Sequence, residues 1–156
     1  MVDAMKRSKG IWFYGLSGSG KSFASSVCKD FIPNAFVVDG DDVRKYVSTD
    51  LSYSKIDRKV QTNRILGISK IVIQNKMFPI ISTVTMQSDL LVECNKLQIE
   101  VVLLSRPMDQ IYQVREIYKN RSNVVGKDIV LEKFDTRTLA NDGTDKFEKR
   151  IRELFG

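Results

Sequence analysis

The sequence predicts an α/β fold, in which a parallel β-sheet of about four to five strands is covered by helices on both faces. Short, continuously apolar runs such as "GIWFY" and "VVLL" alternate with amphipathic stretches long enough to form helices. A glycine-rich loop joins the first apolar run to the first helical stretch, at residues 15–22. The 156 residues are 42% hydrophobic, which suits one compact domain over residues 1–156 with a single core.

The first half of the chain contains two predicted strands and three predicted helices. The strands cover residues 10–16 and 34–40, and the helices cover residues 21–31, 41–47 and about 54–75. The longest helix opens at "SKID", where Ser54 begins a capping box that satisfies the backbone N–H groups of the first turn.

The second half continues the alternation of strand and helix. The predicted strands cover residues 78–84 and 99–105, and the helices cover residues 88–97, 107–119 and 144–155. Pro107 favours a helix start, because proline at the first helical position loses no intrahelical hydrogen bond. Residues 121–137 have no periodic pattern and are expected to be irregular.

Composition narrows the possible functions. The net charge of +6 comes from scattered Lys and Arg, which favours an enzyme with polyanionic substrates over nucleic-acid binding. No apolar run is long enough to span a membrane, and the first ten residues lack a signal-peptide core, so we expect a cytoplasmic protein. The two cysteines are expected to be buried, reduced thiols. There is no histidine, so a general base must be a carboxylate, lysine, tyrosine or cysteine.

The stretch "GLSGSGKS" matches the phosphate-binding loop of nucleoside triphosphatases, and it lies between a strand and a helix as that motif requires. Its glycines allow successive N–H groups to point at phosphate oxygens. We expect Lys21 to reach the β- and γ-phosphates of ATP, and Ser22 to bind Mg²⁺. The predicted ATP-binding residues are Gly15, Ser17, Gly18, Ser19, Gly20, Lys21 and Ser22.

Two carboxylates follow the second predicted strand in "VVDGDDVR". Asp39 and Asp41 stand at the carboxyl end of a strand, where open α/β sheets bind their ligands. Beside a phosphate loop they can orient a metal ion and accept a proton from an attacking hydroxyl. The alternative is an acidic turn in which Asp41 or Asp42 caps a helix. Arg44, one helical turn later, could bind an anionic substrate.

The segment "DLSYSKIDRKVQTNR" offers further contacts to a substrate. Tyr53 could stack on a nucleotide base or pack in the core. Arg58 and Gln61 share a helix face, either towards a ligand or towards solvent. Taken alone, these residues favour a core tyrosine and a solvated face.

Together the motifs resemble those of the adenylylsulfate kinases. The stretches "GLSGSGKS", "VDGDDVR", "TDLSYSKIDR", "IYKN" and "NVVGKD" occur in the family's order over about residues 10–143. The resemblance implies a P-loop kinase fold and a lid over about residues 115–137. It also implies a homodimer that uses ATP and Mg²⁺. The family reaction transfers the γ-phosphate of ATP to the ribose 3′-hydroxyl of adenosine 5′-phosphosulfate.

The resemblance also implies individual roles. Asp41 matches an aspartate near the 3′-hydroxyl, a candidate base, and Asp39 matches an aspartate near the metal. The other implied acceptor contacts are Arg44 and Arg58 at the 5′ anionic group, Tyr53 on the base and Lys119 in the lid.

The acceptor side departs from the family pattern. "STVTMQ", which begins with Ser82 and Thr83, replaces the usual S-F-I-S-P-Y, and Gln61 replaces an asparagine. The lid is also shortened. These differences keep open a second acceptor, cytidine diphosphoramidate, which a related branch phosphorylates at the same hydroxyl.

Two other classes of nucleotide-binding protein fit the sequence less well. A GTPase would need N-K-x-D, but "NKLQ" at residues 95–98 lacks the aspartate and precedes a strand instead of following one. A non-catalytic nucleotide-binding module would not need two carboxylates beside the phosphate loop.

Overall fold

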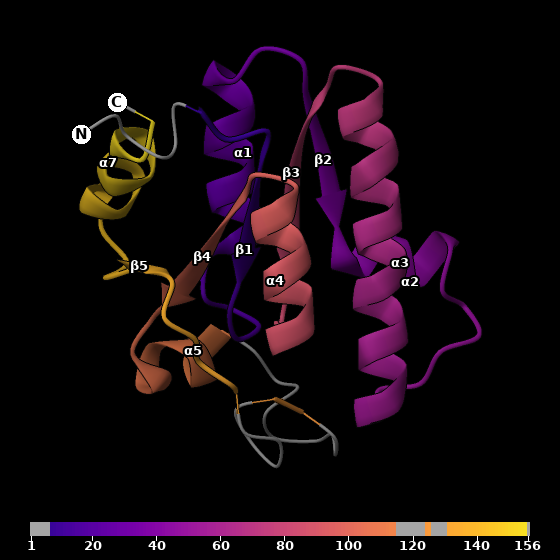
Figure 1. Ribbon diagram of the computed structural model, residues 1–156. Coiled ribbons are helices and arrows are strands. Elements are labelled where there is room, and N and C mark those ends of the chain that lie inside the picture. The colour runs from indigo at the N-terminus through magenta and orange to yellow at the C-terminus, as the bar shows by residue number, and fades with distance from the viewer. Residues whose placement is uncertain (1–6, 115–123, 126–130, 156) are drawn as a thin grey trace.

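The computed structural model describes residues 7–114, 124–125 and 131–155, and within them the predicted α/β architecture is confirmed. Five parallel strands form one sheet in the order β2-β3-β1-β4-β5 (Figure 1). The strands are β1 (Gly10–Tyr14), β2 (Ala35–Asp39), β3 (Phe78–Thr83), β4 (Ile99–Ser105) and β5 (Arg137–Ala140).

Helices cover both faces of this sheet, as Figure 1 shows. One face carries α1 (Lys21–Phe31) and α7 (Asp145–Glu153), and the other carries α3 (Lys55–Gln74) and α4 (Ser88–Lys96). Two shorter helices, α2 (Gly40–Tyr46) and α5 (Met108–Val114), follow β2 and β4.

The central strand β1 supplies both halves of the core, because successive side chains of a strand point to opposite faces. Ile11 and Phe13 pack with α1 and α7, whereas Trp12 and Tyr14 pack with α3 and α4. All four side chains are fully buried, which explains why this strand is continuously apolar in sequence.

Each half of the core holds one free cysteine, as expected. Cys28 of α1 lies in the half beneath α1 and α7, and Cys94 of α4 lies in the opposite half. Burial raises the pKa of each thiol to about 12. Both side chains therefore remain protonated at neutral pH.

The register brings the carboxyl ends of neighbouring strands to one edge of the sheet. Asp39 of β2 lies opposite Ser82 of β3, and Tyr14 of β1 lies opposite Thr83. The phosphate loop follows β1, and α2 follows β2. The residues that the motifs single out are therefore collected at this edge.

The structure differs from the expected elements in a few places. β5 lies partly in the stretch expected to be irregular, and it was not identified as a strand. The first strand ends at Tyr14, two residues early, because the phosphate loop begins there. The expected lid segment lies largely outside the described residues, as does the end of the helix after Pro107.

Candidate active site

The phosphate loop has the backbone geometry that its glycines allow. Gly18 and Gly20 have φ angles of 90° and 105°, which favour glycine because it has no Cβ. The Ser19 N–H donates to the Leu16 carbonyl at 3.0 Å, which closes a turn. The ammonium of Lys21 donates to the carbonyls of Gly15 at 2.8 Å and Leu16 at 2.9 Å, so it lies against its own loop.

A cavity of about 460 Å³ extends from this loop to the start of α3. Most of the residues singled out by sequence line it: Ser17, Gly18, Gly20, Lys21, Ser22, Asp39, Asp41, Arg44, Tyr53, Arg58, Gln61, Ser82 and Thr83. Gly15 and Ser19, which were expected to bind ATP, are buried within the loop and are not among the residues that line the cavity. Lys119 lies outside the described residues.

The two aspartates are held together by a helix cap. Asp39 is the N-cap of α2, and its Oδ1 accepts the backbone N–H of Asp41 at 2.8 Å. The alternative of a cap at Asp41 or Asp42 is therefore wrong, because Asp39 caps the helix. Asp39 and Asp41 both line the cavity. Burial raises the pKa of Asp39, and the charges of Asp41 and Asp42 act in the same direction. A cation bound here would relieve that repulsion.

Gln61 connects α3 to this acidic turn. Its Nε2 donates to the Gly40 carbonyl at 3.0 Å, and its side chain is buried. Gly40 also approaches β3 closely, since a Cβ there would lie 2.9 Å from the Ser82 carbonyl oxygen. The turn that carries Asp39 and Asp41 is thus held from two sides.

Tyr53 is half exposed, so the structure rejects the core-tyrosine alternative. The guanidinium carbon of Arg44 lies 4.2 Å from the centre of its ring, and that of Arg58 lies 5.4 Å away. Arg44 Nη1 also donates to the Ser52 carbonyl at 2.9 Å, and Arg58 Nε donates to the Tyr53 carbonyl at 3.0 Å. Two cations and an exposed aromatic ring therefore form one end of the cavity.

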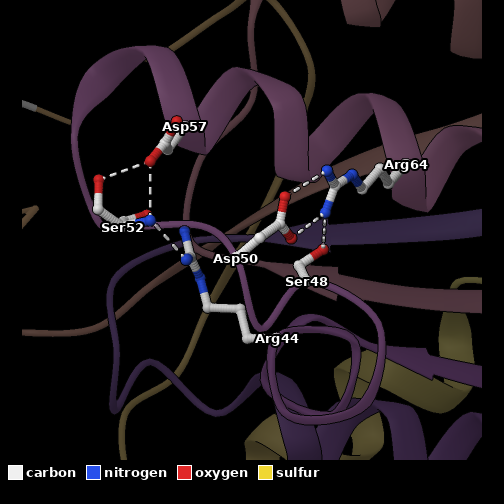
Figure 2. A network of polar contacts seen from close by, with 6 residues as sticks. All are labelled: Arg44, Ser48, Asp50, Ser52, Asp57 and Arg64. Carbon is white, nitrogen blue, oxygen red and sulfur yellow. Dashed lines mark hydrogen bonds and ion pairs between the residues drawn. The ribbon is translucent and has the colours of Figure 1, made fainter.

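A polar network fixes the loop that presents Tyr53 (Figure 2). The Asp57 carboxylate accepts the Ser52 N–H at 2.7 Å and its hydroxyl at 2.6 Å. These bonds lower the pKa of Asp57. Asp50 lies earlier in the loop. Its carboxylate accepts hydrogen bonds from both terminal nitrogens of Arg64 in α3, at 2.7 and 2.9 Å. The loop is thereby tied to α3 at two points.

The Asp50–Arg64 pair predicts a pH-dependent contribution to stability. Hydrogen bonding to Arg64 lowers the pKa of Asp50 to about 2, compared with about 3.9 in unfolded chains. The contribution is therefore present above roughly pH 4 and is lost as pH falls through about 2. Because the pair is exposed, we expect Asp50→Asn to lower the urea midpoint only slightly at pH 7, and by less below pH 4.

Urea midpoints of the wild type and the variant, measured from pH 7 to pH 2, check this expectation. Glu93→Gln is a suitable control, because Glu93 makes a single 3.3 Å contact to Lys96 on another surface. A midpoint difference that stays constant down to pH 2 would contradict the role assigned to Asp50.

Several lining residues were missed by sequence reasoning. They are Phe23, Gly40, Thr62, Ile65 and Arg106, whereas Val84 and Thr85 belong to the altered stretch that the sequence placed on the acceptor side. Arg106 directly follows β4, and its position at the carboxyl end of a parallel strand was a usable signal. Thr62 carried no comparable signal, since it is an internal residue of a long helix.

The stretch after β3 forms a connected polar row beside the cavity. The hydroxyl of Thr83 accepts Trp12 Nε1 at 2.8 Å and donates to the Thr85 carbonyl at 2.8 Å. Thr62 donates to Gln87 Oε1 at 2.8 Å. Residues that differ from the family pattern are therefore built into the wall by specific hydrogen bonds.

Comparison with known proteins identifies the family. The family model for adenylylsulphate kinase matches residues 7–119, which is more than half of the chain. The chain belongs to the adenylylsulphate kinase family. The resemblance seen in the motifs is confirmed, and the fold is that of the P-loop kinases, a family of phosphotransferases.

Similar curated proteins carry the same family description. The adenylyl-sulfate kinase of Buchnera aphidicola subsp. Schizaphis graminum is 35% identical over 48% of this chain and 37% of its own. That of Buchnera aphidicola subsp. Acyrthosiphon pisum is 25% identical over 93% of this chain and 78% of its own. The adenylyl-sulfate kinase of Pseudomonas aeruginosa is 34% identical over 53% of this chain and 45% of its own. Two of these three matches thus span less than half of the relative.

Solved structures share the fold at low sequence identity. The Mycobacterium tuberculosis APS kinase CysC, in complex with AMPPNP and APS, superposes with a TM-score of 0.83. It is 20% identical, over 94% of this chain and 96% of that one. A hexameric APS kinase from Thiobacillus denitrificans superposes with a TM-score of 0.66, over 93% of this chain and 27% of that one. The homodimer expected for this chain stays a prediction.

The sequence predicts no membrane-spanning helix, because its apolar runs are too short. Among the described residues, no helix is both long and apolar enough to cross a bilayer.

Proposed function

We propose that this protein is an ATP-dependent kinase that phosphorylates the ribose 3′-hydroxyl of a small nucleotide. One observation supports this most directly. The phosphate loop, the Asp39–Asp41 turn and the Tyr53 end all line the same cavity. A triphosphate on the loop and a nucleotide beside Tyr53 would place their reacting groups near the two carboxylates. A non-catalytic module would not require this arrangement.

The donor side fits Mg·ATP. Ser22 and Asp39 both line the cavity, and their hydroxyl and carboxylate are oxygen ligands of the type that Mg²⁺ prefers. Among the described residues no group of three or more acidic, Cys or His side chains could hold a metal alone. Mg²⁺ commonly takes one or two protein ligands together with phosphate oxygens, and Ser22 and Asp39 would supply the protein ligands. The ion would neutralise charge on the transferred phosphoryl group.

The side chains would divide the remaining work. The Lys21 ammonium would exchange its loop carbonyls for phosphate oxygens and stabilise charge in the transition state. Asp41 is exposed to the cavity and would accept the proton of the attacking hydroxyl. Asp39 holds the Asp41 backbone N–H and thereby orients it.

The acceptor would lie at the Tyr53 end. Arg44 and Arg58 supply positive charge for an anionic 5′ group, and the Tyr53 ring supplies a stacking surface. Neither feature distinguishes adenine from cytosine. Family membership favours adenosine 5′-phosphosulfate as the acceptor.

Cytidine diphosphoramidate is the second candidate acceptor. It is favoured by the altered wall, where Gln61 and the Thr83–Thr85 contact replace the family pattern. The Gln61 Oε1 atom is buried with no hydrogen-bond partner among the described residues. A buried acceptor of this kind is costly unless a ligand or water satisfies it.

Steady-state kcat/KM for the two acceptors at fixed Mg·ATP tests the proposal. Preference for adenosine 5′-phosphosulfate supports the first choice. A preference of about 100-fold for the cytidine compound, which is about 2.7 kcal/mol of transition-state binding, would reverse the order. Product analysis must place the new phosphate on the 3′-oxygen. Failure of both acceptors would overturn the 3′-kinase proposal.

Tyr53→Ala is expected to raise the acceptor KM and to leave the KM for ATP unchanged. Stacking of a base on an aromatic side chain is worth about 1–3 kcal/mol, so the increase should be at least about fivefold. Initial rates with each substrate varied in turn measure both constants. Tyr46→Ala is the matched control, because Tyr46 is also an exposed tyrosine but does not line the cavity. An unchanged acceptor KM in the Tyr53 variant would mean that the ring does not stack on the substrate.

A further inference from the structure

Two side chains from outside the phosphate loop hold its carbonyl groups. Arg106, just after β4, donates from Nη1 to the Gly18 carbonyl at 3.0 Å. Asn141, just after β5, donates from Nδ2 to the Ser19 carbonyl at 2.9 Å. The loop motif does not contain either residue, and both lie more than 80 positions away from it in the chain.

Asn141 is itself firmly placed. Its side chain is buried, with 6% of its surface exposed. Its backbone N–H donates to the Ser105 carbonyl at 2.7 Å, and its Oδ1 accepts the Gly143 N–H at 2.9 Å. Through its backbone and its side chain, Asn141 therefore links the ends of β4 and β5 to the phosphate loop.

The contact with Ser19 has a consequence for Gly20. A trans peptide is planar, so the C=O of Ser19 and the N–H of Gly20 point in opposite directions. Asn141 is buried and is not among the residues that line the cavity, whereas Gly20 lines it. Holding the Ser19 carbonyl against Asn141 therefore turns the Gly20 N–H away from Asn141.

The close approach also constrains Gly20. A Cβ at Gly20 would lie 2.7 Å from Asn141 Nδ2 and 2.9 Å from Phe147 Cε2. Glycine is thus favoured at position 20 by the close packing of Asn141 and Phe147 as well as by the φ angle of 105°. Any side chain at position 20 would therefore collide with Asn141 and Phe147.

We propose that Asn141 is a positioning residue for the phosphates of ATP. It fixes the peptide plane between Ser19 and Gly20 and so aims a backbone N–H at a phosphate oxygen. This inference rests on the proposed function, since it assumes that the loop binds a nucleoside triphosphate. It assigns a role in donor binding to a residue outside the loop motif.

Two variants test the role. Asn141→Ala removes the whole amide. Asn141→Asp keeps the shape and the acceptor for the Gly143 N–H but loses the donor to Ser19. We expect each to bind Mg·ATP at least about tenfold more weakly in calorimetry, since a hydrogen bond to a charged group is lost or misaligned. The KM of the acceptor should stay at the wild-type value.

The control is Asp142→Ala. Asp142 lies beside Asn141 in the connection between β5 and α7, and its carboxylate accepts the N–H and hydroxyl of Thr144 at 3.0 and 2.7 Å. This variant loses the bonds to Thr144 in the β5–α7 connection but keeps the Asn141 side chain. The affinity of the variant for Mg·ATP should therefore be unchanged. Thermal melting of all variants separates a loss of stability from a loss of binding. Asn141→Asp is also compared with wild type at about 0.5 M salt, which screens the added charge but does not restore the donor.

The outcomes are distinct. Wild-type affinity for Mg·ATP in either Asn141 variant would overturn the inference. A defect of Asn141→Asp that disappears at high salt, or an equal defect in Asp142→Ala, would overturn it as well. These results would leave the proposed kinase function intact. Failure of the wild-type protein to bind Mg·ATP would overturn both.

Discussion

Lys21→Ala is expected to reduce the rate of phosphoryl transfer by roughly 10²–10³-fold while the protein remains folded, because it removes a positive charge that would stabilise the transition state. In the structure the ammonium lies against the carbonyls of Gly15 and Leu16, at the mouth of the loop. It is thus placed to move onto phosphate oxygens when ATP binds. The loss should appear in kcat and in kcat/KM, since the charge interaction strengthens as the reaction proceeds.

Single-turnover assays and thermal melting measure transfer and folding separately. Lys29→Ala is the matched control, because Lys29 is exposed in the last turn of the same helix. It should retain wild-type turnover. Near wild-type turnover in the Lys21 variant would remove the phosphate loop from the proposed mechanism.

Asp41→Asn is expected to reduce kcat by roughly 10²–10⁴-fold, the usual contribution of a positioned general base. Asparagine keeps the size of the side chain but cannot accept the proton from the 3′-hydroxyl. The chain contains no histidine, so no imidazole can substitute. Affinity for ATP should change little. The Asp41 backbone N–H, which Asp39 accepts, is retained in this variant.

Asp42→Asn provides the comparison within the same turn. Asp42 is also acidic and also lies in the first turn of α2, but it does not line the cavity. Its loss changes the local charge equally and should leave kcat close to wild type. Equal rate losses in the two variants would indicate a general electrostatic effect, and full activity in the Asp41 variant would assign the base to another group.

Elements with strong patterns could be predicted from the sequence. β1 is buried throughout and β4 is buried over Val101–Leu104, so each contains an unbroken apolar run. α3 begins at the Ser54 cap that its sequence predicts. β5 gave no such signal. It has four residues at the edge of the sheet, and three of them are exposed, so pairing with β4 rather than its own composition makes it a strand.

The site shows a similar division. Residues in the phosphate loop and in the Asp39 turn are close in sequence to the motif they serve, so spacing alone finds them. Arg106 and Asn141 reach the loop from distant strand ends, and their partners are backbone carbonyls that carry no sequence signal. Taken alone, the sequence favours a core position for Tyr53, because an aromatic residue before a helix gives no signal of binding. Only the resemblance to the family points to a base-stacking role for it.

The two buried thiols can report when the helices on either face of the sheet separate from it. The thiolate is the form that attacks an alkylating reagent, and burial raises the pKa of Cys28 and Cys94 to about 12. Labelling at neutral pH must therefore await exposure of either side of the sheet. Peptide mapping of the alkylated product would time the release of the α1–α7 layer through Cys28, and of the α4 layer through Cys94, without any engineered probe.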